Sequence, residues 1–297
     1  MQNYNKTYNL GWGDPVVVRH ALFKYYQPTV KVVDNAYSYV NNNDYNKMVE
    51  FCRVLNKKLF NVSYKYNIIT VGAMQALQAL MWYYKGKKYT SIKTSKLYFP
   101  YYQYTSKRNS LIFNSKAKKA KHIVLVDSPS NPQGRIYTTK NPIQIWDAVY
   151  NNPIYKSLYT PPLNSETIIG SFGKLFGLSG FRLGWIATDN EEIANFTKHY
   201  VETNTCGLPA PSVAMVIDLL PRYLDEWGDK YEILAKRYID NNREEVNKIL
   251  NIFDNQPISS NGMFYFPKTD EKAKKLLEKC GIVYVDGSKC GDKESIR

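Results

Sequence analysis

The sequence predicts an α/β protein whose mostly parallel sheet is covered by helices on both faces, followed by a smaller α+β domain. Two observations carry this prediction. Short apolar runs, bounded by polar residues, glycine or proline, alternate with stretches of helical spacing over much of the chain. The runs are continuous rather than alternating, which indicates strands buried on both faces, as in parallel sheets. The 297 residues are enough for two domains.

The elements follow in order along the chain. Residues 1–45, rich in Asn and Tyr and containing Gly11, Gly13 and Pro15, predict an arm with loop character. Strands are expected over 66–72, 96–99, 122–127, 143–147, 166–171 and 184–188. Helices are expected over 45–60, from 73 onward, and over 191–204, 210–224 and 229–253. We therefore divide the chain into an arm (1–45), a large domain (46–225) and a small C-terminal domain (226–297), where 262–267 and 281–287 flank a helix over 270–279.

The net charge of +14 raises the question of a nucleic-acid or acidic-membrane partner. The lysines are scattered, and the one dense cluster, at 115–122, has no interleaved aromatic residues. We interpret that cluster as a solvated loop and do not expect nucleic-acid binding. The polar first residues predict no signal peptide, and no apolar run approaches the length of a membrane span.

The four cysteines form no CxxC pair and the three histidines lie far apart in the sequence. This distribution argues against a zinc site and against a disulfide framework. Free cysteines are typical of a reducing compartment, so we expect a cytoplasmic protein.

Polar and aromatic side chains follow the carboxyl ends of the predicted strands, where open α/β sheets bind their ligands. These residues are Gly72, Ala73, Met74, Tyr101, Tyr102, Asn131, Asp147, Tyr150, Ser171, Lys174 and Arg182. The first three begin a helix, whose N-terminus can hold an anion. Together the set offers a phosphate cradle, an aromatic face, an acid, a phenol and a buried lysine. Their common target would be a phosphorylated aromatic ring that carries an aldehyde.

Three motifs carry a resemblance to a known family. They are "SPSNPQG" at 128–134, "WDAVYNNPIYKSLYTP" at 146–161 and "GKLFGLSGFRLGW" at 173–185. They resemble the pyridoxal-phosphate-dependent, fold-type I aminotransferases of class I/II, and within them the branch of plant alliinase and the tryptophan-aminotransferase-related enzymes. The short interval from Asn131 to Asp147 is similar to that of alliinase.

The resemblance implies a cofactor, pyridoxal 5′-phosphate, and a role for each residue of the set. Lys174 would form the Schiff base with the cofactor and move the substrate proton, and Asp147 would pair with the ring nitrogen. Tyr150 and Asn131 would hydrogen-bond the 3′ oxygen of the ring, and Tyr102 would stack on its face. The phosphate would be bound by Arg182, Ser171 and the backbone of Ala73 and Met74.

The same resemblance implies how a substrate is bound. Arg297 would clamp its α-carboxylate beside Asn131, and the loop of Gly11 and Gly13 would close over it. The family is dimeric, so we expect a homodimer in which Tyr37 or Tyr39 reaches the phosphate of the neighbouring subunit. Two departures from the family pattern are Ala73-Met74, where relatives often carry Ser-Thr, and Gly173, where a serine is common. The last strand and helix of the family's small domain would lie beyond Arg297.

Each residue alone has an ordinary explanation: Lys174 a loop lysine, Asp147 a helix cap, Tyr102 a core residue. Their joint spacing favours an aminotransferase that exchanges the amino group of an L-amino acid with a 2-oxo acid. Trp12, Phe264 and Tyr265 favour an aromatic or methionine-like side chain in the substrate. An alliinase-type carbon–sulfur lyase and a catalytically silent homologue remain as alternatives.

Overall fold

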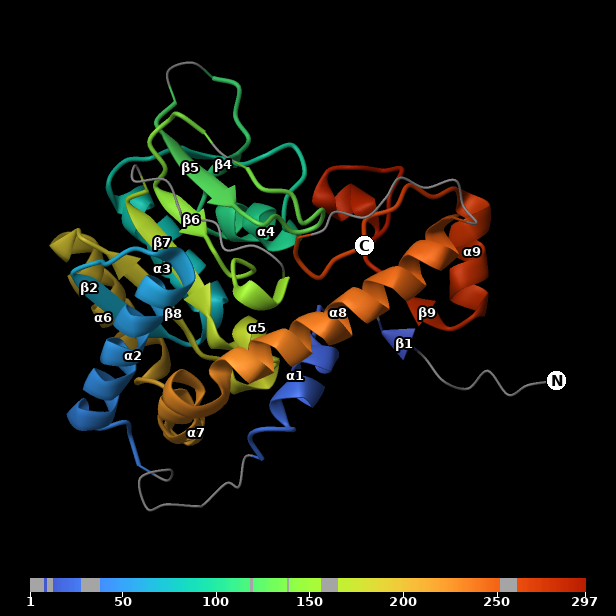
Figure 1. The fold of residues 1–297 in the computed structure, drawn as a ribbon. Helices are drawn as coiled ribbons and strands as arrows, with labels where there is room; N and C mark the ends of the chain where they lie inside the picture. The colour runs from blue at the N-terminus through green and yellow to red at the C-terminus, as the bar shows by residue number, and fades with distance from the viewer. Residues whose placement is uncertain are drawn as a thin grey trace.

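The computed structural model describes residues 8–9, 13–27, 38–117, 120–137, 139–155, 165–251 and 261–297 (Figure 1). The strands are β1 (Tyr8–Asn9), β2 (Tyr66–Thr70), β3 (Ser91–Lys93), β4 (Ile112–Phe113), β5 (His122–Asp127), β6 (Ile145–Asp147), β7 (Thr167–Ser171), β8 (Gly184–Thr188) and β9 (Ile282–Val283). The α-helices are α1 (Val16–Leu22), α2 (Asn42–Phe60), α3 (Gly72–Gly86), α4 (Pro100–Arg108), α5 (Phe172–Leu175), α6 (Glu191–Thr205), α7 (Ala210–Arg222), α8 (Gly228–Asn251) and α9 (Glu271–Lys279).

Seven strands form the main sheet in the order β2-β8-β7-β6-β5-β3-β4. Strand β8 is antiparallel to both of its neighbours, and the remaining pairs are parallel. The prediction of a mostly parallel sheet is therefore confirmed. In a second, two-stranded sheet, β1 pairs in parallel with β9. A segment near the N-terminus thus lies beside one near the C-terminus.

Helices cover both faces of the main sheet. Successive residues of a strand point to opposite faces of the sheet, so each strand packs against helices on both sides. Ile68, Ile169 and Ile186 pack in one apolar cluster with α3, α4 and α6. Their chain neighbours Ile69 and Trp185 pack in the other cluster, with α1, α2, α5, α7 and the first half of α8. The continuous apolar runs of the sequence reflect this two-sided burial.

Helix α8 connects the main sheet with the region of α9 and β9 (Figure 1). Tyr231 and Ala235 in its first half are fully buried in the apolar cluster that also contains residues of α1, α2 and α7, whereas the sequence analysis placed residues 226–297 in the small domain. Helix α1, which the sequence analysis did not predict, packs against α8 and buries Val18 and Leu22 completely. Its β-branched residues favour strand over helix, so tertiary packing decides the conformation here.

The predicted strand at 96–99 is wrong. These residues form a bend that leads into α4, and the strand in this part of the sheet is β3, five residues earlier. The apolar run misled the prediction because Tyr98 is buried in a loop: its ring contacts Phe113, and its backbone N–H donates to the carbonyl of Cys290. Pro100 then begins α4, at a position where proline is favoured.

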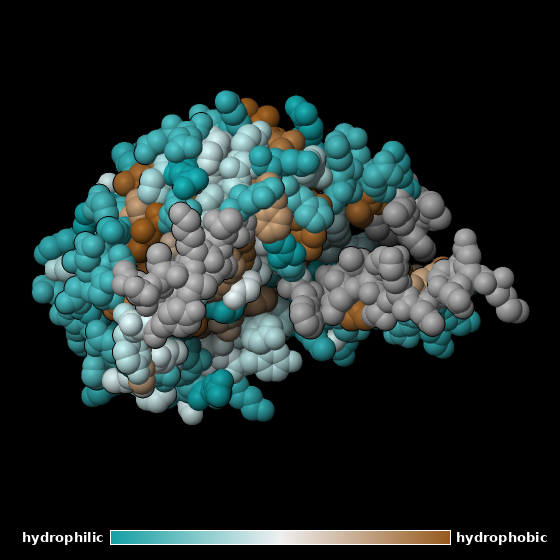
Figure 2. All heavy atoms as spheres, turned by 90° about the horizontal axis from the view of Figure 1, so that it is seen from below, coloured by the Kyte–Doolittle hydropathy of each residue, from teal (hydrophilic) through white to brown (hydrophobic). Residues whose placement is uncertain are grey.

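Hydrophilic residues predominate on the face of the molecule shown in Figure 2. Within the described ranges, no helix is both long and apolar enough to cross a membrane.

The packing of Trp185 gives a test of the fold. A Cβ added to Gly170 would overlap the indole ring, which is 1% exposed and donates a hydrogen bond to Asn56 Oδ1. Gly170→Ala should therefore lower the free energy of unfolding by about 1–3 kcal/mol, measured by urea denaturation. Gly86→Ala is the control: it meets no atom within 4 Å, and alanine should stabilise the helix by roughly 0.5–1 kcal/mol. Equal stability of both variants would contradict this packing.

Candidate active site

A cavity of about 280 Å³ lies at the carboxyl ends of β5, β6 and β7. Eleven residues that the sequence analysis assigned to a cofactor or a substrate line it: Gly13, Ala73, Met74, Tyr102, Asn131, Asp147, Tyr150, Ser171, Lys174, Arg182 and Arg297. Tyr265, which was also assigned to the substrate pocket, does not. Leu77, Phe99, Tyr101, Asp127, Val149 and Phe264 complete the lining. Tyr39 is 80% exposed and is not part of it, while Gly11, Trp12 and Tyr37 lie outside the described residues.

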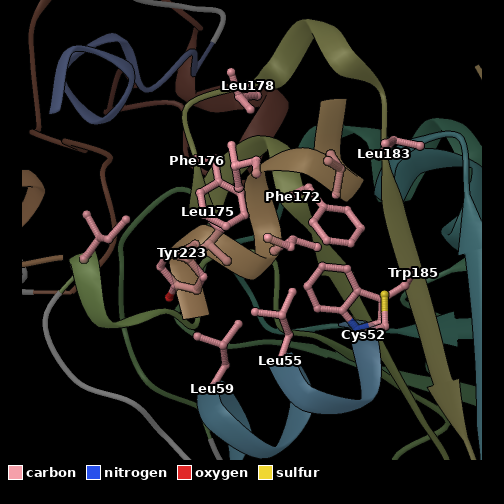
Figure 3. Packing of buried hydrophobic residues seen from close by; sticks show 14 of the residues in the cluster. Cys52, Leu55, Leu59, Phe172, Leu175, Phe176, Leu178, Leu183, Trp185 and Tyr223 are labelled. Carbon is pink, nitrogen blue, oxygen red and sulfur yellow. The ribbon is translucent and has the colours of Figure 1, made fainter. Parts of the chain in front are cut away.

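Apolar side chains anchor the turn that carries Lys174 on the side opposite the cavity. Phe172, Leu175 and Phe176 on either side of the lysine are at most 1% exposed. They point into a cluster with Leu55 of α2 and Trp185 of β8 (Figure 3). Lys174 itself points the other way, into the cavity. Burial of its neighbours thus holds the lysine at the edge of the sheet.

Two phenols also hold the backbone of this turn. The hydroxyl of Tyr155 donates to the carbonyl of Lys174 at 3.1 Å, and that of Tyr231 donates to the carbonyl of Leu175 at 2.6 Å. Both phenols are fully buried in the hydrophobic core. The turn is therefore fixed by hydrogen bonds as well as by packing.

The amine of Lys174 lies in a desolvated place. Its Nζ donates to the carbonyl of Gly13 at 2.7 Å and to Ser179 Oγ at 3.4 Å. Burial lowers the pKa of Lys174 to about 8, the charge of Asp14 opposes that shift, and the guanidinium of Arg182 adds to it. A neutral amine, which is the nucleophilic form, is therefore accessible near physiological pH.

One end of the cavity is built to hold an anion. The N-terminus of α3 has no side-chain cap, and Gly72 at φ 72° begins this helix. The guanidinium of Arg182 lies beside it: a Cβ on Gly72 would be 2.8 Å from Arg182 Nη2. Arg182 Nη1 donates to the carbonyl of Ser179 at 3.0 Å, which fixes the side chain. Helix N-terminus, guanidinium and the adjacent Ser171 match the needs of a phosphate.

Another part of the cavity holds a half-buried carboxyl. Asp147 Oδ2 accepts from the hydroxyl of Tyr102 at 2.7 Å, and Oδ1 accepts from the N–H of Val149 at 3.1 Å. Burial raises the pKa of Asp147, and these two hydrogen bonds oppose the rise. Tyr102 thus contacts the acid through its hydroxyl, and stacking of its ring on a cofactor stays a prediction.

Asp127 is a site residue that the sequence analysis missed. It ends β5 and pairs in register with Asp147 at the end of β6. Its Oδ2 accepts from the backbone N–H of Asn131 at 3.0 Å. Burial, with the charge of Asp147, raises the pKa of Asp127 to about 8. The signal was present in the sequence, because Asp127 stands at a strand end like the other site residues.

The third part of the cavity combines a guanidinium with aromatic rings. Arg297 Nη1 donates to Asn131 Oδ1 at 2.8 Å, and its Cζ lies 4.8 Å from the centre of the Phe264 ring. The same ring contacts Tyr150 edge-on, with 5.0 Å between the centroids. Gly13 approaches Phe264 so closely that a Cβ would lie 3.0 Å from the ring. This arrangement can bind a carboxylate next to an apolar group.

The main sheet, with a lysine turn at the carboxyl end of β7, has the fold of the fold-type I aminotransferases. Two solved structures with this fold each match 98% of the chain at a TM-score of 0.79. One is an archaeal alanine:glyoxylate aminotransferase, 19% identical and covered to 85%. The other is a Methanococcus jannaschii protein described as similar in its active site to kynurenine aminotransferases, 18% identical and covered to 86%.

The chain belongs to the family "Aminotransferase class I and II", whose family model matches residues 89–297. The family resemblance inferred from the three motifs is thus confirmed.

Relatives include tryptophan aminotransferase-related protein 2 of Arabidopsis thaliana, 28% identical over 42% of this chain and 28% of the relative. Asparagine–oxo-acid transaminase of Streptococcus mutans is 26% identical over 62% of this chain and 53% of the relative. Alliin lyase 2 of Allium sativum is 30% identical over 38% of this chain and 24% of the relative. The matched segments therefore span between about a quarter and about half of these relatives.

The pKa of Lys174 can be tested on the cofactor-free protein. The rate at which an amine-reactive reagent modifies Lys174, followed by peptide mass spectrometry, should reach half of its maximum at about pH 8 rather than at 10.5. Arg182→Gln should move this midpoint up, because it removes a neighbouring positive charge. Asp14→Asn should move it down, because it removes a negative one. A midpoint near that of ordinary lysines would contradict the burial of this amine.

Proposed function

We propose that this protein is a pyridoxal-phosphate-dependent aminotransferase that exchanges the amino group of an L-amino acid with a 2-oxo acid. The observation that carries the proposal is Lys174. Its amine has a lowered pKa and faces a cavity that also contains Arg182 and Asp147. Membership in the aminotransferase family supports the proposal.

The donor set of the cavity fits the cofactor. The uncapped N-terminus of α3, opened by Gly72, would hold the phosphate together with Arg182 and Ser171. Asp147 would hold the ring nitrogen, and its hydrogen bonds from Tyr102 and Val149 would orient the carboxyl. Asn131 and Tyr150 would hold the 3′ oxygen. When bound, pyridoxal phosphate supplies an aldehyde that condenses with amines and a ring that withdraws electrons.

Lys174 would also act as the base. Its Nζ, in the neutral form, accepts the proton from the Cα of the amino acid and later returns a proton to complete the exchange. A pKa of about 8 lies near the operating pH and so suits both directions of this transfer. Gly13 and Ser179 hold the amine through hydrogen bonds and so orient it.

The cavity favours an amino acid with a large neutral side chain. Arg297 would bind the α-carboxylate and Arg182 the phosphate. Among the described residues that line the cavity, no further arginine is present to pair with an acidic side chain. Apart from Asp127, the remaining surface is apolar or aromatic: Leu77, Phe99, Tyr101, Val149 and Phe264. Aromatic and methionine-like substrates are therefore the candidates.

A carbon–sulfur lyase is the second candidate, favoured by the 30% identity to an alliin lyase over 38% of the chain. Both activities need the same lysine and the same cofactor contacts. They differ in whether the amino group is passed to an acceptor or a substituent leaves the β carbon. The cavity residues serve either reaction.

An assay with two substrate pairs separates these activities. With cofactor added, the protein should convert tryptophan to its 2-oxo acid only when pyruvate is present as the acceptor. An S-alkyl-cysteine sulfoxide should give no pyruvate in the absence of an acceptor. Pyruvate release without an acceptor would establish the lyase instead. If neither product forms above the level of Lys174→Ala, the protein is a silent homologue.

Arg297→Lys tests the carboxylate site. It keeps the charge but loses the planar guanidinium, whose two parallel N–H groups bind a carboxylate through two hydrogen bonds. A loss of about 1.5–3 kcal/mol should raise KM for the amino acid roughly 10- to 100-fold. The cofactor spectrum should not change, because Arg297 is placed against the substrate. An unchanged kcat/KM would show that the carboxylate is bound elsewhere.

We further propose a homodimer with amino and 2-oxo acids as its small-molecule partners. The family supports this assembly, and light scattering of an active preparation at micromolar concentration should give twice the mass of the chain. A monomer mass would contradict it.

The four cysteines are all free, which supports a cytoplasmic location.

A further inference from the structure

Two carboxyl groups lie side by side at the floor of the cavity. The register of β5 and β6 aligns Asp127 with Asp147, so both side chains stand on the same face of the sheet. Both line the cavity, and Asp127 is only 4% exposed. Two neighbouring carboxyls in a buried place do not ionise together easily, because each charge disfavours the other.

The exposure of the two groups decides which of them is charged. Asp147 accepts from the hydroxyl of Tyr102 and the N–H of Val149, and Asp127 accepts from the N–H of Asn131 and from its own backbone N–H, so each group has two donors. Asp127 is only 4% exposed, whereas Asp147 is half-buried. The better hydrated carboxyl ionises more easily, so the proton stays on Asp127.

The surroundings of Asp127 keep it neutral. The titratable groups that face it are Tyr102 on α4, Asp147 and Tyr150 from β6 and the turn after it, Tyr137 from the loop after Asn131, and Cys290 from the C-terminal turn. Burial raises the pKa of Asp147, and its hydrogen bonds from Tyr102 and Val149 oppose that rise. Burial and the charge of Asp147 raise the pKa of Asp127 to about 8.

Asp127 is also linked to the substrate end of the cavity. Its carboxyl holds the backbone of Asn131, and the side chain of Asn131 accepts from the guanidinium of Arg297 at 2.8 Å. The position of Arg297 thus depends on a turn that Asp127 fixes.

We propose that Asp127 is a positioning residue that works as a neutral carboxylic acid: it holds Asn131, and through it Arg297, while Asp147 carries the single negative charge of the pair. The part that concerns Arg297 as a carboxylate ligand rests on the proposed function. The neutral state of Asp127 and its hold on the turn do not, and both can be tested without cofactor or substrate.

The first experiment follows the protonated carboxyl in the cofactor-free protein by infrared spectroscopy. The wild type should show a carboxylic-acid band that is lost as the pH rises through about 8. Asp127→Asn should lack this band. In Asp147→Asn the band should be lost at lower pH, because the charge that opposes ionisation of Asp127 is gone. A wild type without such a band at pH 7 would overturn the proposal.

Thermal unfolding gives an independent test of the protonation of Asp127 in the folded protein. The pKa of Asp127 is about 8 in the folded protein against an ordinary value of 3.8, so the folded state holds one more proton between these values. Stability conferred by this proton is complete below the lower value and falls as the pH rises to the upper one. As the pH rises to about 8, the Tm of the wild type should therefore fall relative to that of Asp127→Asn. Above about pH 8 the difference between the two Tm values should stay constant. A difference that does not vary with pH would mean that Asp127 has a purely structural role, and would overturn the proposal.

The hold on the turn is tested by hydrogen exchange of the segment 128–135. Asp127→Asn keeps an oxygen that accepts from the N–H of Asn131, so protection should stay as in the wild type. Asp127→Ala removes the acceptor, and exchange should speed up about tenfold, the equivalent of about 1.4 kcal/mol. Equal exchange in the two variants would overturn the positioning role. In the active enzyme, KM for the amino acid should rise in Asp127→Ala and not in Asp127→Asn.

Discussion

The packing of the turn around Lys174 is the constraint on which the rest of the site depends. A lysine in a short turn would ordinarily extend into solvent. Here Phe172, Leu175 and Phe176 are buried against α2 and β8, so the turn cannot move without exposing three large apolar side chains (Figure 3). Burial of a single side chain of this size contributes about 1.5–3 kcal/mol. The same burial removes water from the amine and thereby lowers its pKa.

The charges of the cavity follow from this desolvated lysine. Three basic side chains, Lys174, Arg182 and Arg297, line a cavity that also contains the carboxyls of Asp127 and Asp147, of which we propose that only Asp147 is charged. Such an excess of positive charge is costly in a buried place unless anions enter it. A phosphate beside Arg182 and a carboxylate beside Arg297 would balance the site. The electrostatics therefore match a phosphorylated cofactor together with an amino acid, independently of the sequence motifs.

Much of this architecture could be predicted from the sequence. The strands β2, β5, β7 and β8 were predicted nearly to their ends because they are long, apolar and followed by glycine or polar residues. The shared position of the site residues followed from one rule, that parallel strands end at the same edge of the sheet. The family pattern then predicted a role for each residue, and the cavity brings Lys174, Asp147, Arg182 and Arg297 together.

The remaining features depend on contacts that are distant in the sequence. Helix α1 has poor helix formers and is stabilised by α8, more than two hundred residues away along the chain. The aromatic residues of 96–99 were mistaken for a strand, because loop burial and strand burial produce the same apolar pattern. The position of Asp127 at a strand end was visible in the sequence, but its pairing with Asp147 depends on the register of β5 and β6, which a sequence does not show.

The central claim is that Lys174 is the residue that receives the aldehyde of pyridoxal phosphate. The most direct measurement is the visible absorption spectrum of the purified protein as the cofactor is added, compared with that of Lys174→Ala. We expect the wild type to turn yellow with one cofactor per chain, and borohydride to fix the cofactor on the peptide that contains Lys174. The variant should show only the spectrum of free cofactor. A wild type that stays colourless, or label on another lysine, would contradict the account.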